Sequence, residues 1–515
     1  MRILKSKLPD VVLEDKSITD FVLTHAERLA DKAALIEGGS GTATSYATLA
    51  DRIRRFAGGL KARGVGPGTT WALMAPNIPD YAVAFHGLAY AGACVTTLNP
   101  TYGAEEIAFQ LGDSKATAII TVGMFLETAR KAAAKCGIEE IYVLDDADAP
   151  ALSTLFAEPL SAQVEVDLAD HVVALPYSSG TTGFPKGVML THQNLVGNLC
   201  QAKEFIEMGE GDVCFAVLPF FHIYGMQVLM NLALGSGSTV VTVPRFDLVQ
   251  MLELVQTHRI TRLYLVPPIV LALAKHPVVD EYDLSSVTQI YSGAAPLSGE
   301  LASAAAERVG CTIGQGYGMT ESSPVTHSIH PSDYKPASVG TILPNTEVRV
   351  VDPDSGNDAD PGARGEIWVR GPQVMKGYLG NPEATAATLD ADGWLHTGDI
   401  AVVDDDGHFF IVDRLKELIK VKGFQVAPAE LEAKLLSHDH IADAAVIGIP
   451  DEEAGERPKA FVVKTGDAAL DEAGVVAFAA EGFASYKHLA VVEFIDAIPK
   501  SASGKILRRE LRART

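Results

Sequence analysis

The sequence predicts an α/β fold with a large N-terminal domain, made of two αβ-layered subdomains and a β-rich subdomain, and a small mobile α+β C-terminal domain. The chain of 515 residues is too long for one hydrophobic core, so two or more domains are expected. Up to residue 310, short β-rich runs alternate with helical stretches, as in a mainly parallel sheet. Over 338–412 the runs shorten and lie among Gly, Pro and Asp turns, which indicates the β-rich part.

The composition narrows the class of protein. Apolar content of 47% and charged content of 21% are typical of a globular chain. A net charge of −23 argues against nucleic acid or an anionic membrane as a partner, since both need basic patches. The five cysteines lie far apart without a CxxC pair, which favours reduced thiols in the cytoplasm. The N-terminus lacks a signal-peptide core, and the longest apolar run, 263–274, is too short to span a bilayer, so no integral membrane association is expected.

The N-terminal part is expected to begin with helices and continue with two αβ series. Residues 17–65 look helical: a Ser-Ile-Thr-Asp cap begins one apolar-periodic stretch, and a second stretch runs over 46–63. The first series has expected strands at 71–74, 95–98, 118–122 and 141–144, and expected helices at 79–92, 103–113 and 125–135. The second series covers 192–310, with expected strands at 213–218, 239–243, 262–266 and 289–292.

The rest of the chain predicts the β-rich part and the C-terminal domain. The β-rich part has expected strands at 348–351, 365–370 and 409–412. The C-terminal unit has expected helices at 429–437 and 472–481, and expected strands at 442–449, 460–464 and 489–494. No low-complexity linker separates the parts, so the charged stretch 413–417 is interpreted as a hinge. The predicted domains are therefore 1–414 and 415–515, with the hinge near Lys416.

One segment, 177–187, is rich in Ser, Thr and Gly and ends in Pro-Lys-Gly. Hydroxyls, free backbone N–H groups and the single cation Lys186 suit a polyphosphate. The segment is not a Walker A loop, because Gly187 follows the lysine where that pattern needs Ser or Thr. An isolated cluster of this composition is more often a surface loop. Its length and the apolar runs on both sides favour phosphate binding here.

Two further motifs could contribute to a ligand site. The stretch 219–225 holds His222 and Tyr224 in an aromatic cluster, which could line a pocket or belong to the core. The stretch 314–321 allows close backbone approach through its glycines, offers Tyr317 as a flat face for a base, and offers Glu321 to Mg²⁺. Taken alone, it could also be a glycine-rich turn.

Single charged residues near the end of the chain are weaker signals. Asp399 follows a glycine turn, where a carboxylate could hold ribose hydroxyls or serve the turn itself. Lys420, Lys422 and Lys505 lie on expected loops, where lysines are usually solvated.

Together the motifs resemble one family. The complete set of motifs is much more specific than any single motif in it. The matching stretches are YSSGTTGFPKG (177–187), PFFHIYG (219–225), GQGYGMTE (314–321), GEIWVRG (365–371), GWLHTGD (393–399), VDRLKELIKVKGFQVAPAELE (412–432) and PKSASGKILRREL (499–511). The chain resembles the adenylate-forming acyl-CoA synthetases over essentially its whole length, and most closely the 4-coumarate:CoA ligase branch.

The resemblance implies a reaction in two halves. A carboxylic acid attacks the α-phosphorus of ATP, giving an acyl-adenylate and pyrophosphate, and coenzyme A then displaces AMP. It also implies Mg²⁺, and a C-terminal domain that rotates about Lys416 between the half-reactions. The implied catalytic residues are Lys505, Lys420, His222, Thr320 and Glu321.

The resemblance also assigns binding residues. Those implied for the phosphates are Ser178, Ser179, Gly180, Thr181, Thr182, Gly183 and Lys186, with Thr181 and Glu321 for Mg²⁺. Those implied for the nucleoside are Gly293, Ala294, Ala295, Gln315, Gly316, Tyr317, Asp399 and Arg414. After rotation, Lys420 and Gln425 would approach the adenylate, and Arg245, Lys422 and Gly423 would serve coenzyme A. The implied acid pocket is Tyr224, Val228, Tyr291, Gly316 and Val325, with Tyr291 at a position where the family has a lysine.

The acid itself stays open between two classes. A phenol at Tyr224 favours a hydroxycinnamate-type aryl acid, because a polar site rejects substrates that leave it unpaired. A medium- or long-chain fatty acid is the alternative. Less favoured readings are an enzyme that loads a carrier protein and a non-catalytic nucleotide-binding sensor. The chain is expected to be a monomer or a homodimer.

Overall fold

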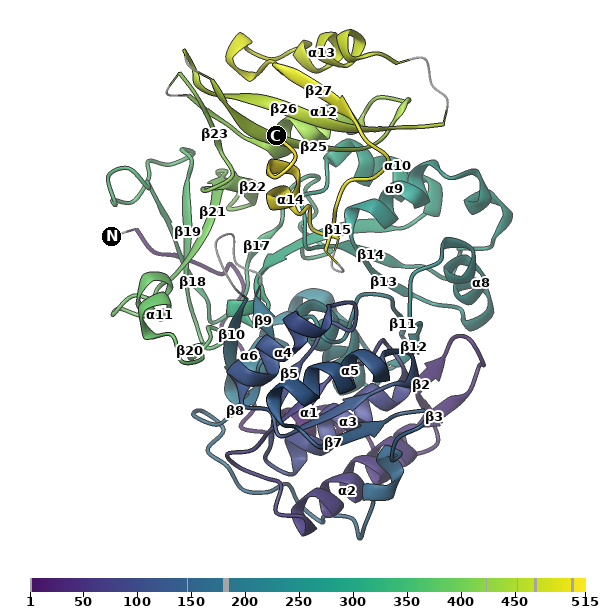
Figure 1. The fold of residues 1–515 in the computed structure, drawn as a ribbon. Coiled ribbons are helices and arrows are strands. Elements are labelled where there is room, and N and C mark those ends of the chain that lie inside the picture. The colour runs from purple at the N-terminus through teal and green to yellow at the C-terminus, as the bar shows by residue number, and fades with distance from the viewer. Residues whose placement is uncertain are drawn as a thin grey trace.

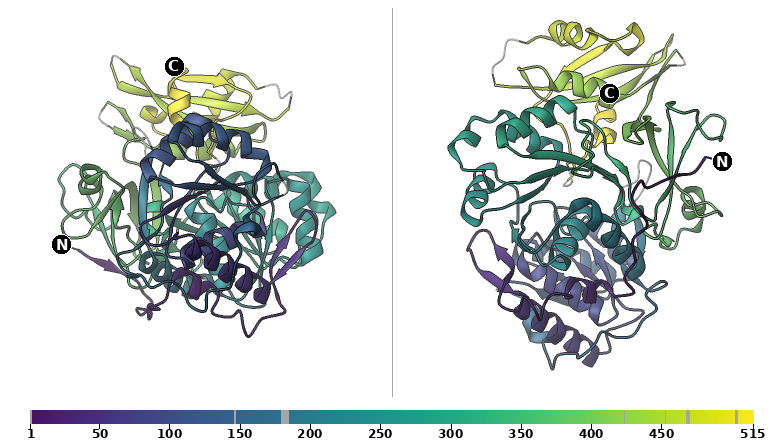
Figure 2. Two further views of the ribbon diagram at one scale, coloured as in Figure 1. Left: turned by 60° about the horizontal axis from the view of Figure 1, so that its bottom comes forward. Right: turned by 180° about the vertical axis from the view of Figure 1, so that it is seen from behind.

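The computed structural model describes residues 2–145, 147–178, 185–422, 424–451, 453–466, 470–501 and 504–515. These residues form four β-sheets (Figure 1). Two large sheets with their helices make the body of the molecule, and a third sheet lies beside them. The fourth, with the end of the chain, lies over one end of that body (Figure 2). The predicted large N-terminal part and small C-terminal part are thus both present.

The first sheet is parallel except at one edge. Its order is β20-β10-β8-β5-β4-β6-β7, and β10 runs antiparallel to β8, β9 and β20. Its strands are β4 (Thr70–Leu73), β5 (Cys94–Thr97), β6 (Ala118–Thr121), β7 (Glu140–Val143), β8 (Val172–Ala174), β9 (Tyr177–Ser178), β10 (Lys186–Thr191) and β20 (Gly377–Tyr378). The accompanying helices are α2 (Tyr46–Ala62), α3 (Pro79–Tyr90), α4 (Ala104–Ser114) and α5 (Gly123–Cys136).

Helices cover this sheet on both faces, which explains its unbroken apolar strands. In β4, Trp71 and Leu73 belong to the main core together with α2 and α3. The alternate residues Ala72 and Met74 pack on the other face against α4 and α5. Successive strand residues point to opposite faces, so a sheet covered twice favours apolar residues on both faces of each strand.

The second sheet has the order β17-β16-β15-β14-β13-β11-β12-β2-β3 and is parallel from β15 to β2. Its strands are β2 (Ala33–Glu37), β3 (Ala43–Ser45), β11 (Val213–Ala216), β12 (Thr239–Thr242), β13 (Arg262–Leu265), β14 (Gln289–Ser292), β15 (Thr312–Gly318), β16 (Val325–Ser328) and β17 (Thr341–Ile342). Its helices are α1 (Ile18–Val22), α6 (His192–Ile206), a π-helical turn (Gly225–Leu232), α7 (Ala233–Gly235), α8 (Leu248–His258), α9 (Pro267–Lys275) and α10 (Gly299–Val309). Short 3₁₀ turns cover Leu152–Leu155, Pro277–Glu281, Thr320–Ser322 and Ser485–Lys487.

The helical prediction for residues 17–65 is wrong in its middle. Helix α1 ends at Val22, and two strands, β2 and β3, precede α2. Strand β2 pairs in parallel with β12, with Leu35 opposite Val240, so its conformation is set by a partner two hundred residues later. The glycines after β2 form the turn into β3, and Gly41 has a φ of 73°. Long-range pairing here overrides the local helical pattern.

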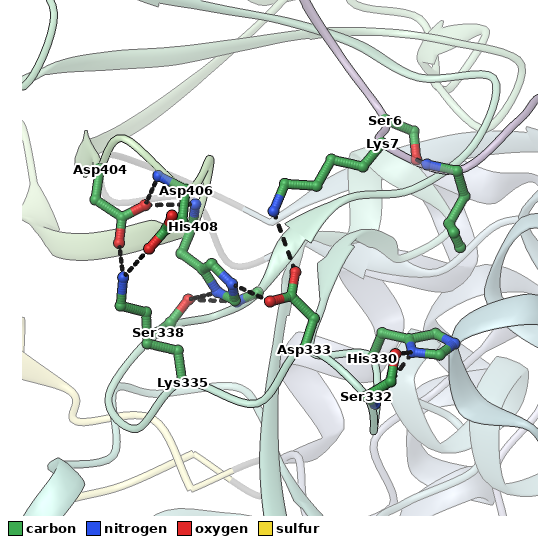
Figure 3. A network of polar contacts seen from close by, with 12 residues as sticks. Ser6, Lys7, His330, Ser332, Asp333, Lys335, Ser338, Asp404, Asp406 and His408 are labelled. Atoms are coloured by element: carbon green, nitrogen blue, oxygen red, sulfur yellow. Dashed lines mark hydrogen bonds and ion pairs between the residues drawn. The ribbon is translucent and has the colours of Figure 1, made fainter.

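The third sheet is antiparallel and joins the two ends of the N-terminal part. Its order is β1-β18-β19-β21-β22, made of β1 (Leu4–Lys5), β18 (Glu347–Val351), β19 (Gly365–Arg370), β21 (Leu395–Val403) and β22 (Phe409–Arg414), with α11 (Pro382–Thr388) beside it. A polar network fastens it to the loop after β16 (Figure 3). Buried His408 contacts Asp333 at 3.1 Å and Ser338 Oγ at 3.1 Å, while Lys7 donates to Asp333 at 3.2 Å. Lys335 pairs with Asp404 and Asp406. This network keeps β21 and β22 against the second sheet.

The C-terminal unit has its own sheet and core. The strands are β23 (Ile419–Val421), β24 (Phe424–Val426), β25 (Ile441–Asp451), β26 (Gly455–Lys464) and β27 (Val491–Phe494), and the helices are α12 (Pro428–Leu436), α13 (Glu472–Ala480) and α14 (Arg508–Arg512). Its main apolar cluster uses residues between Ile419 and Val492. A small cluster of Ile400, Leu418 and Ala427 crosses the expected boundary at 414/415, so that boundary stays a prediction.

Candidate functional site

A cavity of about 580 Å³ lies where strands of the second sheet end, beside the third sheet and the C-terminal unit. Parallel α/β sheets bind ligands at the carboxyl ends of their strands, because the loops there converge. The predicted residues that line it are Ser178, Lys186, His222, Tyr224, Val228, Tyr291, Gly293, Ala294, Gly316, Tyr317, Thr320, Glu321, Val325, Arg414, Lys416 and Lys505. Segments separated by more than three hundred residues therefore meet at one site.

The phosphate segment enters and leaves the cavity on paired strands. Ser178 of β9 lies opposite Lys186 of β10 in an antiparallel ladder. The predicted residues Ser179, Gly180, Thr181, Thr182 and Gly183 between them lie outside the described residues. Lys186 Nζ lies 4.5 Å from the ring centroid of Tyr378, a cation–π distance. The cation at the end of the motif is thus directed by an aromatic ring on β20.

Tyr378 also holds the predicted metal ligand. Its hydroxyl donates to Glu321 Oε1 at 2.8 Å, and Glu321 is 4% exposed. Burial, followed by the charge of Glu321, raises the pKa of Tyr378, so the phenol stays a neutral donor. Tyr378 was not predicted as a site residue, because a tyrosine after glycine is unremarkable in sequence and only the pairing of β20 with β10 brings it to the site. In the structure it connects Lys186 with Glu321.

The glycine-rich part of the stretch 314–321 is a strand, and Thr320 and Glu321 begin a 3₁₀ turn after it. Residues Thr312–Gly318 form β15, which pairs in parallel with β14. At its end, Tyr317 donates to Asp399 Oδ2 at 2.7 Å, and Arg414 Nε lies 3.3 Å from Asp399 Oδ1. Asp399 and Arg414 are opposite each other on β21 and β22. Burial, then the Asp399 charge, raises the pKa of Tyr317 well above its usual range. The carboxylate predicted for the ribose is thus held in place from two sides.

Lys505 reaches the cavity from the C-terminal unit. Two hydrogen bonds to Ser501 place it: Ser501 N–H donates to the Lys505 carbonyl at 2.8 Å, and Lys505 N–H donates to Ser501 Oγ at 3.2 Å. Gly504, just before it, has a φ of 81°. Burial, helped by the Arg414 cation, lowers the pKa of Lys505 to about 8. An anion bound beside Lys505 would raise this pKa again, because an opposite charge favours the protonated amine.

His222 faces the same charge. Burial, followed by the Lys505 cation, lowers the pKa of His222 to about 4, so the ring is neutral at pH 7. Its Nδ1 accepts the Tyr224 N–H at 3.3 Å, which places the ring proton on Nε2. His222 is therefore a neutral donor at the cavity wall.

Part of the cavity wall is aromatic and apolar. Tyr264 and Tyr291 are neighbours on β13 and β14 with parallel rings, 5.7 Å apart at an angle of 2°. Val228 lies on the π-helical turn and is 3% exposed, and Val325 begins β16. π-Helical turns in α-helical stretches are frequent at functional sites. Tyr264 is a second residue that the sequence analysis missed, because a tyrosine within a buried strand looks like a core residue.

Some predicted residues lie elsewhere. Ala295 and Gln315 do not line the cavity, and the Gln315 side chain exchanges two 3.1 Å hydrogen bonds with the backbone of Leu297. Arg245 is exposed on the segment after β12. Lys420, Lys422 and Gln425 belong to the β23–β24 hairpin, where a loop was expected, and also lie outside the cavity. Gly423 lies outside the described residues. The roles predicted for all these residues stay predictions.

Two structural features are absent from the described residues. Within the described ranges, no group of three or more His, Cys, Asp or Glu side chains is arranged to hold a metal ion. Helices long and apolar enough to cross a bilayer are also absent from the part of the chain that the structure describes.

Comparisons with known proteins agree with this arrangement. The model of the AMP-binding enzyme family matches residues 22–379, and that of the AMP-binding enzyme C-terminal domain matches 430–505. The chain is 45% identical to 4-coumarate–CoA ligase 1 of Petroselinum crispum, over 99% of this chain and 96% of the relative, and 43% identical to 4-coumarate–CoA ligase 5 of Oryza sativa subsp. japonica, over 99% and 97%.

Solved structures agree as well. The anthranilate CoA ligase AuaEII in complex with anthranoyl-AMP superposes with a TM-score of 0.89 at 26% identity, covering 98% of both chains. ATP-bound MatB from Rhodopseudomonas palustris superposes with a TM-score of 0.87 at 30% identity, covering 97% of this chain and 99% of that one.

Proposed function

Because the chain belongs to the AMP-binding enzyme family, we propose that it is an AMP-forming carboxylate–CoA ligase for hydroxycinnamate-type aryl acids. One observation carries this proposal: a single cavity joins Lys505, Lys186 and Glu321 to the aromatic wall of Tyr264 and Tyr291. A site for this reaction needs a cationic end for phosphate and carboxylate, and a flat apolar end for the acid.

The reaction forms two bonds in turn. A carboxylate oxygen of the acid attacks the α-phosphorus of ATP, and pyrophosphate leaves with the electron pair of the broken P–O bond. The sulfur of coenzyme A, as a thiolate, then attacks the acyl carbon, and AMP leaves with one of the original carboxylate oxygens. Little covalent chemistry falls to the protein, which positions the groups and offsets their charge.

Residues in the cavity wall, and Asp399 beside it, support the first step. Lys505 would lie between the carboxylate and the α-phosphate, two anions whose repulsion its charge reduces. Lys186 and Thr320 would bind phosphate oxygens, and the Asp399–Arg414 pair would hold the ribose. Neutral His222 would donate to the acid or the phosphate without repelling Lys505.

Mg²⁺ fits Glu321 as a ligand. A magnesium–nucleotide complex needs only one or two carboxylates beside water and phosphate oxygens, so a single buried Glu321 fixed by Tyr378 suffices. The bound ion would neutralise phosphate charge during pyrophosphate release. Thr181, the other predicted metal residue, lies outside the described residues.

The position of the C-terminal unit suits the first half-reaction. Lys505 lines the cavity, while Lys420 and Gln425 do not. We propose that a rotation of residues 415–515 about Lys416 withdraws Lys505 and brings the β23–β24 hairpin to the adenylate, with Arg245 and Lys422 near coenzyme A. We also propose a cytoplasmic location, which the five free cysteines support, and a monomeric or homodimeric state.

The test is product analysis with a panel of acids. The protein with ATP, Mg²⁺ and coenzyme A should release pyrophosphate with 4-hydroxycinnamate and give the CoA thioester by mass spectrometry. Benzoates and C4–C18 fatty acids should react more weakly. For fatty acids there are two reasons: the relatives are 4-coumarate–CoA ligases, and an alkyl chain offers no partner to hydroxyls in the cavity wall. Preference for a fatty acid, or pyrophosphate release without a thioester, would contradict the proposal.

A further inference from the structure

Two buried hydroxyls without a hydrogen-bond partner border the cavity. Within the described ranges, they are Tyr264 Oη and Ser292 Oγ, the partnerless buried side-chain atoms that belong to its lining residues. Buried polar groups are nearly always paired, because an unpaired one loses water and gains nothing in return. A partnerless hydroxyl in the wall of a binding cavity therefore indicates a ligand group that pairs with it.

Tyr264 lacks the hydrogen bonds that the hydroxyl of its stacked neighbour, Tyr291, makes. Tyr291 Oη donates toward two backbone carbonyls, of Ile329 at 3.1 Å and of Phe205 at 3.3 Å, so its hydrogen is used. Tyr264, with a side chain in the same register position of the next strand, has no such partner and is 1% exposed. Burial also raises the pKa of Tyr264 well above its usual range, so its hydroxyl keeps its proton and can donate or accept.

Strand β13 sets the distance between Tyr264 and Lys505. Val266 follows β13 and lies beside Gly504, the neighbour of Lys505: a Cβ on Gly504 would be 3.2 Å from Val266 Cγ2. Tyr264 precedes Val266 by two residues, which is roughly 7 Å along a strand. An acid whose carboxylate meets Lys505 would thus extend past Val266 toward Tyr264.

Tyr224, the phenol that the sequence predicted for the acid, also lines the cavity. A Cβ on Gly293 would lie 2.8 Å from Tyr224 Cε1 and 3.3 Å from its Oη, so this phenol lies against the glycine predicted to frame the adenine. Its hydroxyl therefore lies beside Gly293, next to the expected place of the adenine.

We propose that Tyr264 is a specificity-determining residue whose hydroxyl hydrogen bonds the 4-hydroxyl at the far end of an aryl acid, an inference that rests on the proposed function. An acid without a polar group there leaves Tyr264 unpaired, which the site penalises. A 4-methoxycinnamate lacks the hydrogen-bond donor of the 4-hydroxyl and is bulkier there, so its kcat/KM should also be lower.

The test compares two conservative variants. Tyr264→Phe removes the hydroxyl within the cavity wall. Tyr81→Phe removes an equally buried, partnerless hydroxyl outside the cavity and is the matched control. Neither change deletes a hydrogen bond of the free protein, so both variants should melt at or above the wild-type temperature. For each protein, kcat/KM of thioester formation is measured with 4-hydroxycinnamate, 2-hydroxycinnamate and cinnamate.

We expect the wild type and Tyr81→Phe to prefer 4-hydroxycinnamate, and Tyr264→Phe to lose about 10-fold of that preference over cinnamate, as for one hydrogen bond. Turnover with cinnamate should be retained. An unchanged ratio in a folded Tyr264→Phe overturns this inference alone. Wild-type turnover of none of the three acids overturns the proposed function together with it. Equal preference of the wild type for the 2- and 4-hydroxy acids also overturns the inference, without any variant.

Discussion

Lys505 is the residue on which the proposed chemistry depends most. Replacing it by alanine should slow adenylation by about 10²–10³-fold, the effect of losing one well-placed electrostatic donor. Thioester formation from a supplied acyl-adenylate should survive much better, because Lys505 is proposed to act only in the first half. Pyrophosphate release and thioester formation measure the two halves separately, and an equal loss in both would contradict the role.

The environment of Lys505 predicts a pH dependence. Its pKa is lowered to about 8, mainly by burial, and a lysine is cationic below its pKa. For the free enzyme, kcat/KM of adenylation should therefore hold below pH 8 and fall above it. In Lys505→Arg the guanidinium stays protonated, so whatever activity remains should persist to higher pH. The same fall near pH 8 in this variant would assign it to another group.

Tyr378 gives a third prediction at this scale. Tyr378→Phe keeps the ring under Lys186 but removes the hydrogen bond to Glu321, so KM for the magnesium–ATP complex should rise roughly 10-fold, as for a bond to a charged group. Tyr378→Leu removes both contacts and should raise it further. A Phe variant with wild-type KM would show that Glu321 needs no such partner.

The site residues that sequence could predict are those whose type is unusual for its place. Lysine in a Ser/Gly-rich segment, or a carboxylate after glycines, is uncommon without a ligand, so Lys186 and Glu321 stood out. Tyr264 and Tyr378 did not, because an aromatic residue in a buried strand is ordinary. Only the cavity, the stacking on Tyr291 and the bond to Glu321 distinguish them.

At the scale of elements, the turn between β22 and β23 is where the hinge is proposed. Leu415, Glu417 and Leu418 donate backbone hydrogen bonds there, to Gly398 and Arg414, and a proline at 416 leaves all three in place. Lys416→Pro should spare adenylation but stall thioester formation, because it restricts the dihedral changes that a rotation needs. Normal overall turnover in this variant would place the hinge elsewhere.

A buried ion pair joins the last helix to the C-terminal sheet. Arg508 of α14 contacts Glu432 of α12 at 2.7 Å and the Val446 carbonyl of β25 at 3.1 Å. Arg508→Leu would leave Glu432 buried without its cation, which should destabilise the C-terminal unit by about 3–5 kcal/mol. Urea unfolding followed by protease cleavage within 415–515 would measure this. The double variant with Glu432→Leu should recover most of the loss, whereas no recovery would show that packing, not charge, is responsible.

Helices and strands could be predicted where the local hydrophobic pattern matches the packing of the element in the folded protein. The parallel strands read as short apolar runs because helices cover both faces of their sheets. Strands β2 and β3 were missed because β2 depends on β12, far along the chain. The β23–β24 hairpin was missed because its strands are only three residues each and β23 carries Lys420 at its centre.

At the scale of the whole molecule, the cavity exists only because the two large sheets, the third sheet and the C-terminal unit meet. Lys505 comes from the C-terminal unit and Lys186 from the first sheet, and both line the cavity. The network of Lys7, Asp333 and His408 keeps the third sheet in position (Figure 3). Sequence could predict the separate parts and, through the family resemblance, their meeting. The position of the C-terminal unit depends on contacts between surfaces that no local pattern describes.

The central claim, ligation through an acyl-adenylate, is tested most directly by labelling the acid. With both carboxylate oxygens of 4-hydroxycinnamate replaced by ¹⁸O, the reaction with ATP, Mg²⁺ and coenzyme A should give a CoA thioester with one ¹⁸O and AMP with the other. Mass spectrometry of the products reads both. Unlabelled AMP, or label in inorganic phosphate together with ADP, would contradict the account.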